Sequence, residues 1–148
     1  GIASTAYRAR RPFHPERFFN FIDRPWTNGK LLRSKGFFWL ASKYQEAGSW
    51  SQAGGLMRYG FAGRWWRFVP REQWPQDAET KAEILKKWLP ETADCRQELV
   101  FIGQHIDFAL LSAELDACLL TDQEMALGVE GWQQLNDPFG DWYEEVAA

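Results

Sequence analysis

The sequence has few of the residues on which disulfides, metal sites and many enzymes depend. Its 148 residues include 2 cysteines and 2 histidines, too few for a disulfide framework, and this cysteine usage fits a reducing compartment. The longest unbroken apolar run covers residues 36–41, far short of the roughly 18 residues that a membrane-spanning helix needs. The arginines near the N-terminus are not followed by the apolar block of a secretory signal. We therefore expect a cytoplasmic protein with no membrane partner.

Nucleotide and hydrolase motifs are also missing. The paired glycines Gly54 and Gly55, like Gly60 and Gly63, lack the G-x-x-x-x-G-K-[ST] spacing and have no helix behind them. A phosphate site of that type needs the free backbone N–H groups of a strand-to-helix loop. There is no G-x-S-x-G and no evident nucleophile–base pair, and Glu144 and Glu145 are interpreted as solvated tail residues. We expect this chain alone to have no catalytic residues and no bound cofactor.

The few metal-ligating residues are spread along the chain. His14, Cys95 and His105 are the candidates, since Cys118 falls on the apolar stripe of a predicted helix. Cys95 and His105 flank a predicted strand, and ten residues at ~3.3 Å each would hold them roughly 30 Å apart. The two cannot share one ion within a chain, and His14 is explained as the residue ahead of a helix. The three remain weak candidates for a metal site.

Charge and aromatic rings are what the sequence does have. It contains 9 tryptophans, and residues 1–71 carry 13 Lys and Arg against 3 Asp and Glu, whereas residues 72–148 carry 4 against 17. One interpretation is that the halves fold together and their surfaces interleave. The other is a basic face presented to an acidic partner, a phosphate or a nucleic acid. The pattern leaves both open.

Hydrophobic patterning predicts an α+β fold. Residues 32–41 are typical of a central strand buried on both faces, with Arg33 and Lys35 at its rim. Further strands are expected at residues 5–11, 49–63 and 98–103. The strand over residues 49–63 is broken by Gly54-Gly55, which indicates a bulge or a close approach of two backbones. The short connection makes the second and third strands antiparallel neighbours. We expect an antiparallel sheet of about four strands with helices packed on one face, a split β-α-β, ferredoxin-like arrangement.

The helices are placed by their caps and apolar stripes. One opens at His14-Pro15-Glu16, one is capped by Asp107, and a short one has a capping box over residues 121–124 and ends at Gly128. A mostly polar helix over residues 78–89, capped by Asp77, belongs to a peripheral insertion over about residues 70–94. The rest, from Gly131, is an acidic and aromatic tail that includes Tyr143.

Binding of RNA by the sheet is one alternative function. Lys35-Gly36-Phe37 matches the first three places of the longer motif of RNA-recognition domains, and Trp39 is tolerable in the fifth. Phe38 does not fit the small fourth place and Ser42 does not fit the final aromatic one. With a sequence pI near 5.4, a dedicated nucleic-acid binder is not expected.

Several blocks of the sequence resemble one known family. They are residues 1–2, 7–17 (YRARRPFHPER), 33–41 (RSKGFFWLA), 51–55 (SQAGG), 62–66 (AGRWW), 96–103 (RQELVFIG) and 119–122 (LLTD). In this order they are similar to the C-terminal domain of CobW-type proteins, over nearly the whole chain except residues 70–94. The resemblance implies one domain over residues 1–148. Since the chain does not begin with Met, we expect an excised domain or a processed fragment.

The resemblance also implies a function. The family couples an N-terminal P-loop GTPase, absent here, to an α+β domain, and is linked to cobalt delivery for cobalamin synthesis and to zinc homeostasis. GTP, magnesium and zinc or cobalt would belong to the full-length parent. The implied partners are the protein's own GTPase domain and a client metalloprotein, and an apolar patch exposed by excision would also favour a homo-oligomer. No histidine-rich stretch is present, so metal storage by this chain is not expected.

We therefore expect a regulatory and protein-interaction domain of a metallochaperone GTPase. Arginine and tryptophan are enriched among binding hot spots, which makes six residues the candidates for contact. They are Arg33, Lys35, Arg58, Arg64, Trp65 and Trp66. The alternatives are an RNA-binding sheet domain and a free-standing metal-binding module.

Overall fold

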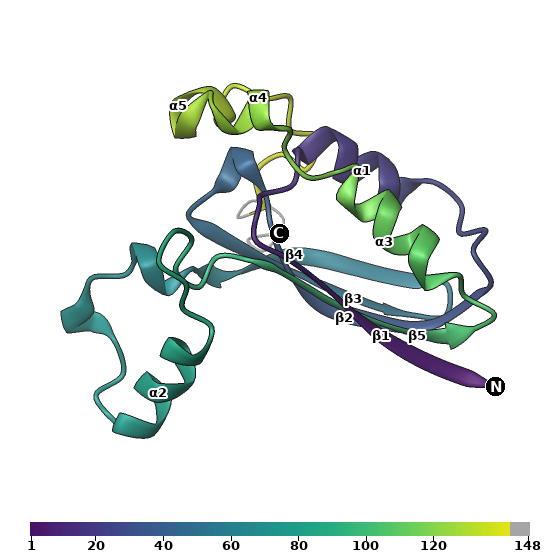
Figure 1. Ribbon diagram of the computed structural model, residues 1–148, viewed down its shortest axis with the longest axis horizontal. Coiled ribbons are helices and arrows are strands. Elements are labelled where there is room, and N and C mark those ends of the chain that lie inside the picture. The colour runs from purple at the N-terminus through teal and green to yellow at the C-terminus, as the bar shows by residue number, and fades with distance from the viewer. Residues whose placement is uncertain (143–148) are drawn as a thin grey trace.

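The computed structural model describes residues 1–142, which form one five-stranded antiparallel sheet with helices on one face (Figure 1). Its strands are β1 Ile2–Ala9, β2 Lys30–Trp39, β3 Glu46–Ala53, β4 Leu56–Arg64 and β5 Gln97–Gln104. Its α-helices are α1 Pro15–Asp23, α2 Ala78–Lys86, α3 Phe108–Asp116, α4 Asp122–Met125 and α5 Gly128–Trp132. The strand order β1-β5-β2-β3-β4 confirms the predicted α+β class and the central place of β2. Within residues 1–142 no helix is long and apolar enough to cross a membrane.

The split β-α-β unit consists of β1, α1 and β2. Strand β5 lies between β1 and β2 and pairs antiparallel with both. Helices α1 and α3 lie side by side over one face of the sheet in Figure 1. Their buried side chains, Phe18 and Phe21 from α1 and Leu111 and Leu115 from α3, form the main core with the inward residues of the strands. The Phe18 ring stacks on the ring of Phe13 at 4.2 Å.

Local capping explains where the helices begin. His14 precedes α1, and its Nδ1 accepts the backbone N–H of Glu16. Asp107 accepts the N–H of Leu110 at the start of α3. Thr121 and Glu124 form both hydrogen bonds of a capping box at α4. Each cap satisfies backbone donors that a helix start leaves without a partner. These predicted helix starts are confirmed.

The prediction of a single third strand over residues 49–63 is wrong. Residues 46–64 form the hairpin β3–β4, in which Ala53 pairs with Leu56. Gly54-Gly55 is therefore the two-residue turn and not a bulge within a strand. Gly54 has a φ of +58°, which a glycine adopts without steric cost. The hairpin raises the number of strands from the expected four to five.

The predicted burial of β2 is correct only at its C-terminal end. Phe38 and Trp39 are 0% and 3% exposed and belong to two different hydrophobic clusters, on opposite faces. Towards its N-terminal end, Arg33, Lys35 and Phe37 are exposed. The two cations thus lie along one face of the strand and not at its rim. The reason is that helices cover only the core-facing side of this part of β2 and leave its other side exposed.

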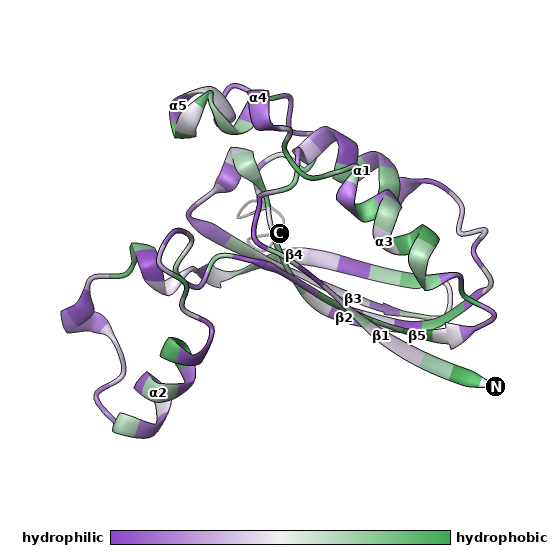
Figure 2. Ribbon diagram, in the orientation of Figure 1, coloured by the Kyte–Doolittle hydropathy of each residue, from purple (hydrophilic) through white to green (hydrophobic). Residues whose placement is uncertain are grey.

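Other boundaries also differ from the predictions: the strands predicted at residues 32–41 and 98–103 are β2 Lys30–Trp39 and β5 Gln97–Gln104. The first strand begins at Ile2 and ends at Ala9, and the predicted helix 78–89 ends at Lys86. Gly128, with a φ of +70°, does not end the last helix but begins α5. Helix α2 stands away from α1 and α3 in Figures 1 and 2. The predicted tail supplies Phe139 and Trp142 to the main core, whereas Tyr143, Glu144 and Glu145 lie outside the described residues.

Candidate functional site

The face of the sheet opposite α1 and α3 gathers exposed cations and apolar side chains. Arg58 of β4 pairs with Ser51 of β3, which pairs with Lys35 of β2, which pairs with Val100 of β5. These four residues form one row across the sheet. With neighbouring strands about 4.8 Å apart, the backbones at Lys35 and Arg58 are about 10 Å from each other. We call this surface, with Arg33, Phe37 and Ile102 beside the row, the open face.

The cations of the open face lack acidic partners. Within residues 1–142 no carboxylate forms an ion pair with Arg33, Lys35 or Arg58. The nearest acidic residue along the sheet, Glu98, is already occupied by Arg96 at 3.2 Å, Lys87 at 3.5 Å and Arg8 at 3.8 Å. Burial opposes ionisation of Glu98, but Arg96 and Lys87 outweigh it and hold the pKa of its carboxyl below the ordinary value. The open face is therefore net positive.

Apolar side chains lie between these cations. Phe37 is 44% exposed, and Val100 and Ile102 of β5 are half-buried. These three are not among the predicted contact residues, because Phe37 belongs to the strand predicted to be buried on both faces and Val100 and Ile102 lie in a continuous apolar run of similar type. The burial of every second residue of β5 is visible only in the structure, because residues 99–102 are all apolar and show no alternation in the sequence. An aromatic and two aliphatic side chains among unpaired cations are the composition of a protein-binding surface.

The six predicted contact residues do not all lie on this surface. Arg33, Lys35 and Arg58 are together on the open face. Arg64, exposed at the end of β4, donates to the side-chain oxygen of Gln45 at 3.3 Å. Trp65 is 5% exposed in the second hydrophobic cluster, and half-buried Trp66 packs edge-on against Trp74 at 5.9 Å.

The three weak metal candidates lie apart in the fold. His14 caps α1, Cys95 is fully buried ahead of β5, and His105 is exposed after β5. Burial raises the pKa of the Cys95 thiol to about 12, which opposes the thiolate that zinc requires. In residues 1–142 no three His, Cys, Asp or Glu side chains come close enough to hold a metal ion.

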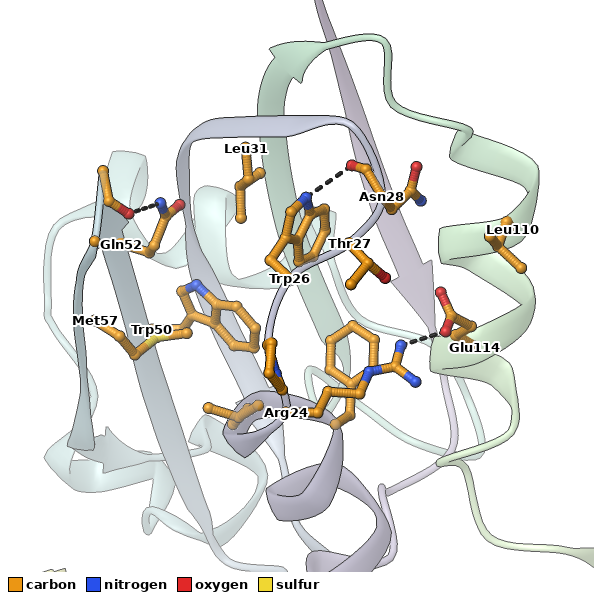
Figure 3. A pocket seen from close by; sticks show the side chains of 15 residues that line it. Arg24, Trp26, Thr27, Asn28, Leu31, Trp50, Gln52, Met57, Leu110 and Glu114 are labelled. Carbon is orange, nitrogen blue, oxygen red and sulfur yellow. Dashed lines mark hydrogen bonds and ion pairs between the residues drawn. The ribbon is translucent and has the colours of Figure 1, made fainter.

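A pocket of about 300 Å³ lies at the end of the sheet where the β3–β4 turn meets α1 and α3 (Figure 3). Trp26 and Trp50 are its largest walls. The Trp26 indole N–H donates to the carbonyl of Asn28 and that of Trp50 to the hydroxyl of Ser34. These indole donors are satisfied within the chain. The pocket therefore offers apolar surface and has the size for one or two side chains of a partner.

Comparison with known proteins identifies relatives over nearly the whole chain. The family model of the cobalamin synthesis protein cobW C-terminal domain matches residues 2–119. Zinc-regulated GTPase metalloprotein activator 1 of Dictyostelium discoideum is 41% identical over 140 residues, which are 93% of this chain and 29% of that protein. A zinc chaperone of Mycobacterium tuberculosis is 30% identical over 145 residues, 97% of this chain and 36% of that protein. The chain thus spans about a third of the length of these relatives.

A solved structure shares the fold. The Zn(II)-bound YjiA GTPase from E. coli superimposes with a TM-score of 0.52 at 15% sequence identity, over 80% of this chain and 30% of that one. A zinc-bound triple mutant of the same protein superimposes equally well. At this identity the likeness concerns the arrangement of the sheet and its helices.

Proposed function

Since the chain belongs to the family of cobalamin synthesis protein cobW C-terminal domains, we propose that it is the docking and regulatory domain of a GTP-dependent metal chaperone. The chain itself is not catalytic. It binds the GTPase domain that precedes it in the parent protein, or a client metalloprotein, through the open face. A GTP-driven change in the GTPase domain then alters that contact. Residues 1–148 act as one unit in which residues 70–94 are an insertion.

One observation carries this proposal. Arg33, Lys35 and Arg58 lie side by side on a sheet surface that also exposes Phe37, and none of the three has a carboxylate partner in the described part of the chain. Unpaired charges around apolar side chains favour a partner that is acidic and partly apolar. Arg64 lies apart from these three, at the end of β4, where it pairs with Glu46 beyond a register shift.

The names of the relatives support the choice of metal and nucleotide. One is a zinc-regulated GTPase metalloprotein activator and another a zinc chaperone. We propose that the parent of this chain binds GTP with magnesium and delivers zinc in the cytoplasm. Cobalt, which the family description brings in through cobalamin synthesis, is the alternative cargo. We propose that this chain itself holds neither metal, since within residues 1–142 no three His, Cys, Asp or Glu side chains are close enough to do so. Self-association through the open face is the competing use of that surface.

Binding of the chain to the separately produced GTPase domain of its parent tests the proposal. We expect Lys35→Glu with Arg58→Glu to weaken the affinity about tenfold or more, because both changes place a negative charge opposite an acidic partner. Arg64→Glu is expected to weaken it less. The matched control is Lys86→Glu, an exposed lysine of α2 that already pairs with Glu83. Equal affinities for the double variant and the control would contradict the open face as the docking surface.

RNA binding is the second candidate, favoured by the exposed ring of Phe37 beside Lys35. Aromatic rings and cations on a sheet are the means by which single strands are bound. Titration of single-stranded RNA at low and high salt decides between the two functions. A docking domain should bind RNA weakly at low salt and not at high salt, whereas an RNA-binding domain should bind it tightly at low salt and still measurably at high salt. Zinc titration of the same chain tests the remaining alternative, a metal-binding module.

A further inference from the structure

A second surface, distinct from the open face, is a cleft of about 850 Å³ between α4–α5 and the loop that follows α2. In Figure 1 these two sides are the helices at the upper left and the loops below them. Tyr44, Phe68 and Trp132 line it as a cluster of edge-on rings, with centroids 5.4 and 6.5 Å apart. Leu89 on one side and Val129 on the other are 43% and 39% exposed. The cleft thus exposes apolar side chains both inside it and at its two edges.

Two guanidinium groups in the cleft have no acidic partner. Arg10 donates to the carbonyl oxygens of Ala93 and Lys87, each at 2.8 Å, and forms no ion pair within residues 1–142. Arg67 is exposed, lies over the ring of Phe68 at 5.4 Å and reaches the carbonyl of Glu91 only at 3.5 Å. The third cation of the cleft, Arg11, is already paired with Asp122. Arg67, which also interacts with the thiol of Cys95, is therefore the exposed cation of the cleft that has no carboxylate partner among the described residues.

Thr92, a residue that lines the cleft, has a buried side-chain oxygen without a hydrogen-bond partner among the described residues. This oxygen has no exposed surface through which a ligand in the cleft could reach it, so the binding argument does not depend on it. The cleft thus combines apolar walls with one exposed cation, Arg67, and one exposed carboxylate, Glu91.

We propose that this cleft binds a segment of a protein partner whose apolar side chains lie between Leu89 and Val129 and whose carboxylate pairs with Arg67. A segment of polypeptide fits better than a small anion. The apolar surface continues onto both edges of the cleft, and only a ligand long enough to reach both edges would bury it. This site is separate from the open face and does not depend on what the open face binds. Leu89 and Thr92 come from the predicted insertion, so that part of the chain would set the choice of partner.

The test uses the full chain and two short synthetic amphipathic peptides. Both carry leucine at helical spacing along one face, and one carries glutamate beside that face where the other carries lysine. Fluorescence anisotropy measures their affinities. We expect the glutamate peptide to bind the wild type about fivefold to tenfold more tightly than the lysine peptide, and Arg67→Glu to reverse this preference. Val129→Asp should weaken both peptides. Arg58→Glu, an equal charge change on the open face, is the matched control and should leave the affinities for both peptides unchanged.

The indole N–H signals of the tryptophans report where the peptide binds. Trp39 and Trp132 line the cleft, whereas Trp26 and Trp50 line the pocket at the other end of the sheet. In ¹H–¹⁵N spectra we expect the glutamate peptide to shift the first pair and leave the second unchanged. Shifts of Trp26 and Trp50 alone, or affinities unaffected by Arg67→Glu and Val129→Asp, would overturn the proposal. Succinate binding as tightly as the peptide would overturn it in favour of a small-anion site.

Discussion

The side-chain amide of Gln97 makes two hydrogen bonds to the backbone of Trp39 where the ladder between their strands ends. Its oxygen accepts the Trp39 N–H at 2.8 Å, and its nitrogen donates to the Trp39 carbonyl at 2.8 Å and to that of Arg11 at 2.9 Å. The backbone pairing of β2 with β5 stops at Phe37 and Glu98. Gln97, with no exposed surface, thus joins β5 to β2 and to the chain that leaves β1.

Replacing Gln97 should therefore cost much of the stability of this fold. We expect Gln97→Leu to lower the free energy of unfolding by about 3 kcal/mol, because it leaves buried backbone groups without partners. Urea denaturation measures the change. Gln133→Leu, at the exposed position that follows α5, is the control and should change the free energy of unfolding by less than about 0.5 kcal/mol. Similar values for the two variants would show that the amide of Gln97 is dispensable.

The segment after α5 closes the main core although the family match ends at residue 119. Phe139 is 5% exposed. The centroid of its ring lies 6.2 Å from that of Phe18, 5.9 Å from that of Phe38 and 6.2 Å from that of Trp142. We expect Phe139→Ala to lower the free energy of unfolding by about 3–5 kcal/mol, the usual cost of removing a buried ring. Leu127→Ala, at a 55% exposed position, should cost less than about 1 kcal/mol. Thermal or urea unfolding distinguishes the two.

His14 gives the stability of α1 a dependence on pH. Its Nδ1 must be unprotonated to accept the Glu16 N–H, and burial together with the charge of Arg17 holds the pKa of His14 below its ordinary value. The carboxylates of Glu124, 3.9 Å away, and of Glu16 oppose this shift but do not cancel it. Below about pH 6.5 His14 is therefore protonated in the unfolded chain but stays neutral in the folded chain. The free energy of unfolding falls as a result.

We expect His14→Asn to remove this part of the pH dependence, since asparagine keeps a capping oxygen that does not titrate. Urea denaturation at about pH 7.5 and about pH 5.5 measures it. Glu124 stays ionised over this range, because its hydrogen bonds with Arg17 hold the pKa of its carboxyl at about 2. An equal loss of stability in wild type and variant on acidification would contradict the role of His14.

The two cysteines should not react while the chain is folded. Burial raises the pKa of Cys95 to about 12 and that of Cys118 to about 11, so little thiolate forms near neutral pH. We expect 5,5′-dithiobis(2-nitrobenzoic acid) to label neither thiol in the native chain and both in guanidinium chloride. Rapid labelling of the native chain would show that one of these sites opens without unfolding.

Charge reversal on the open face should change docking and leave folding unaffected. Lys35 and Arg58 are exposed and form no ion pair in residues 1–142, so their replacement by glutamate should shift the free energy of unfolding by less than about 0.5 kcal/mol each. Docking of the wild type to the GTPase domain should weaken as salt rises, because exposed charges are screened beyond about 10 Å at 0.1 M salt. Calorimetry at two salt concentrations measures both effects. Salt-independent docking would point to the apolar residues as the main contact.

The positions of the helices could be predicted because each start is encoded within a few residues. His14, Asp77, Asp107 and Thr121 each accept a hydrogen bond from a backbone N–H two or three residues later, and such a cap depends little on the rest of the fold. The apolar run over residues 36–41, which contains Phe38 and Trp39, likewise indicated the central strand.

The candidate sites could be predicted only in part. Arg33, Lys35 and Arg58 were identified by residue type, but their common face follows from the pairing of β2 with β3 and of β3 with β4. The placing of Trp65 in a hydrophobic cluster could not be predicted, because a tryptophan beside an arginine is found both in cores and in interfaces. The cleft around Arg67 is formed by segments that lie far apart in the sequence.

The sequence by itself determined the class of the fold, the caps of the helices and the central strand, because these depend on contacts within one turn or one strand. Only the tertiary structure decided that Gly54-Gly55 is a hairpin turn, which face of the sheet is open, and which cations lack a partner. These properties arise from strand register and from contacts between residues that are distant in sequence, and a single strand's alternation is the same whichever of its faces the helices cover.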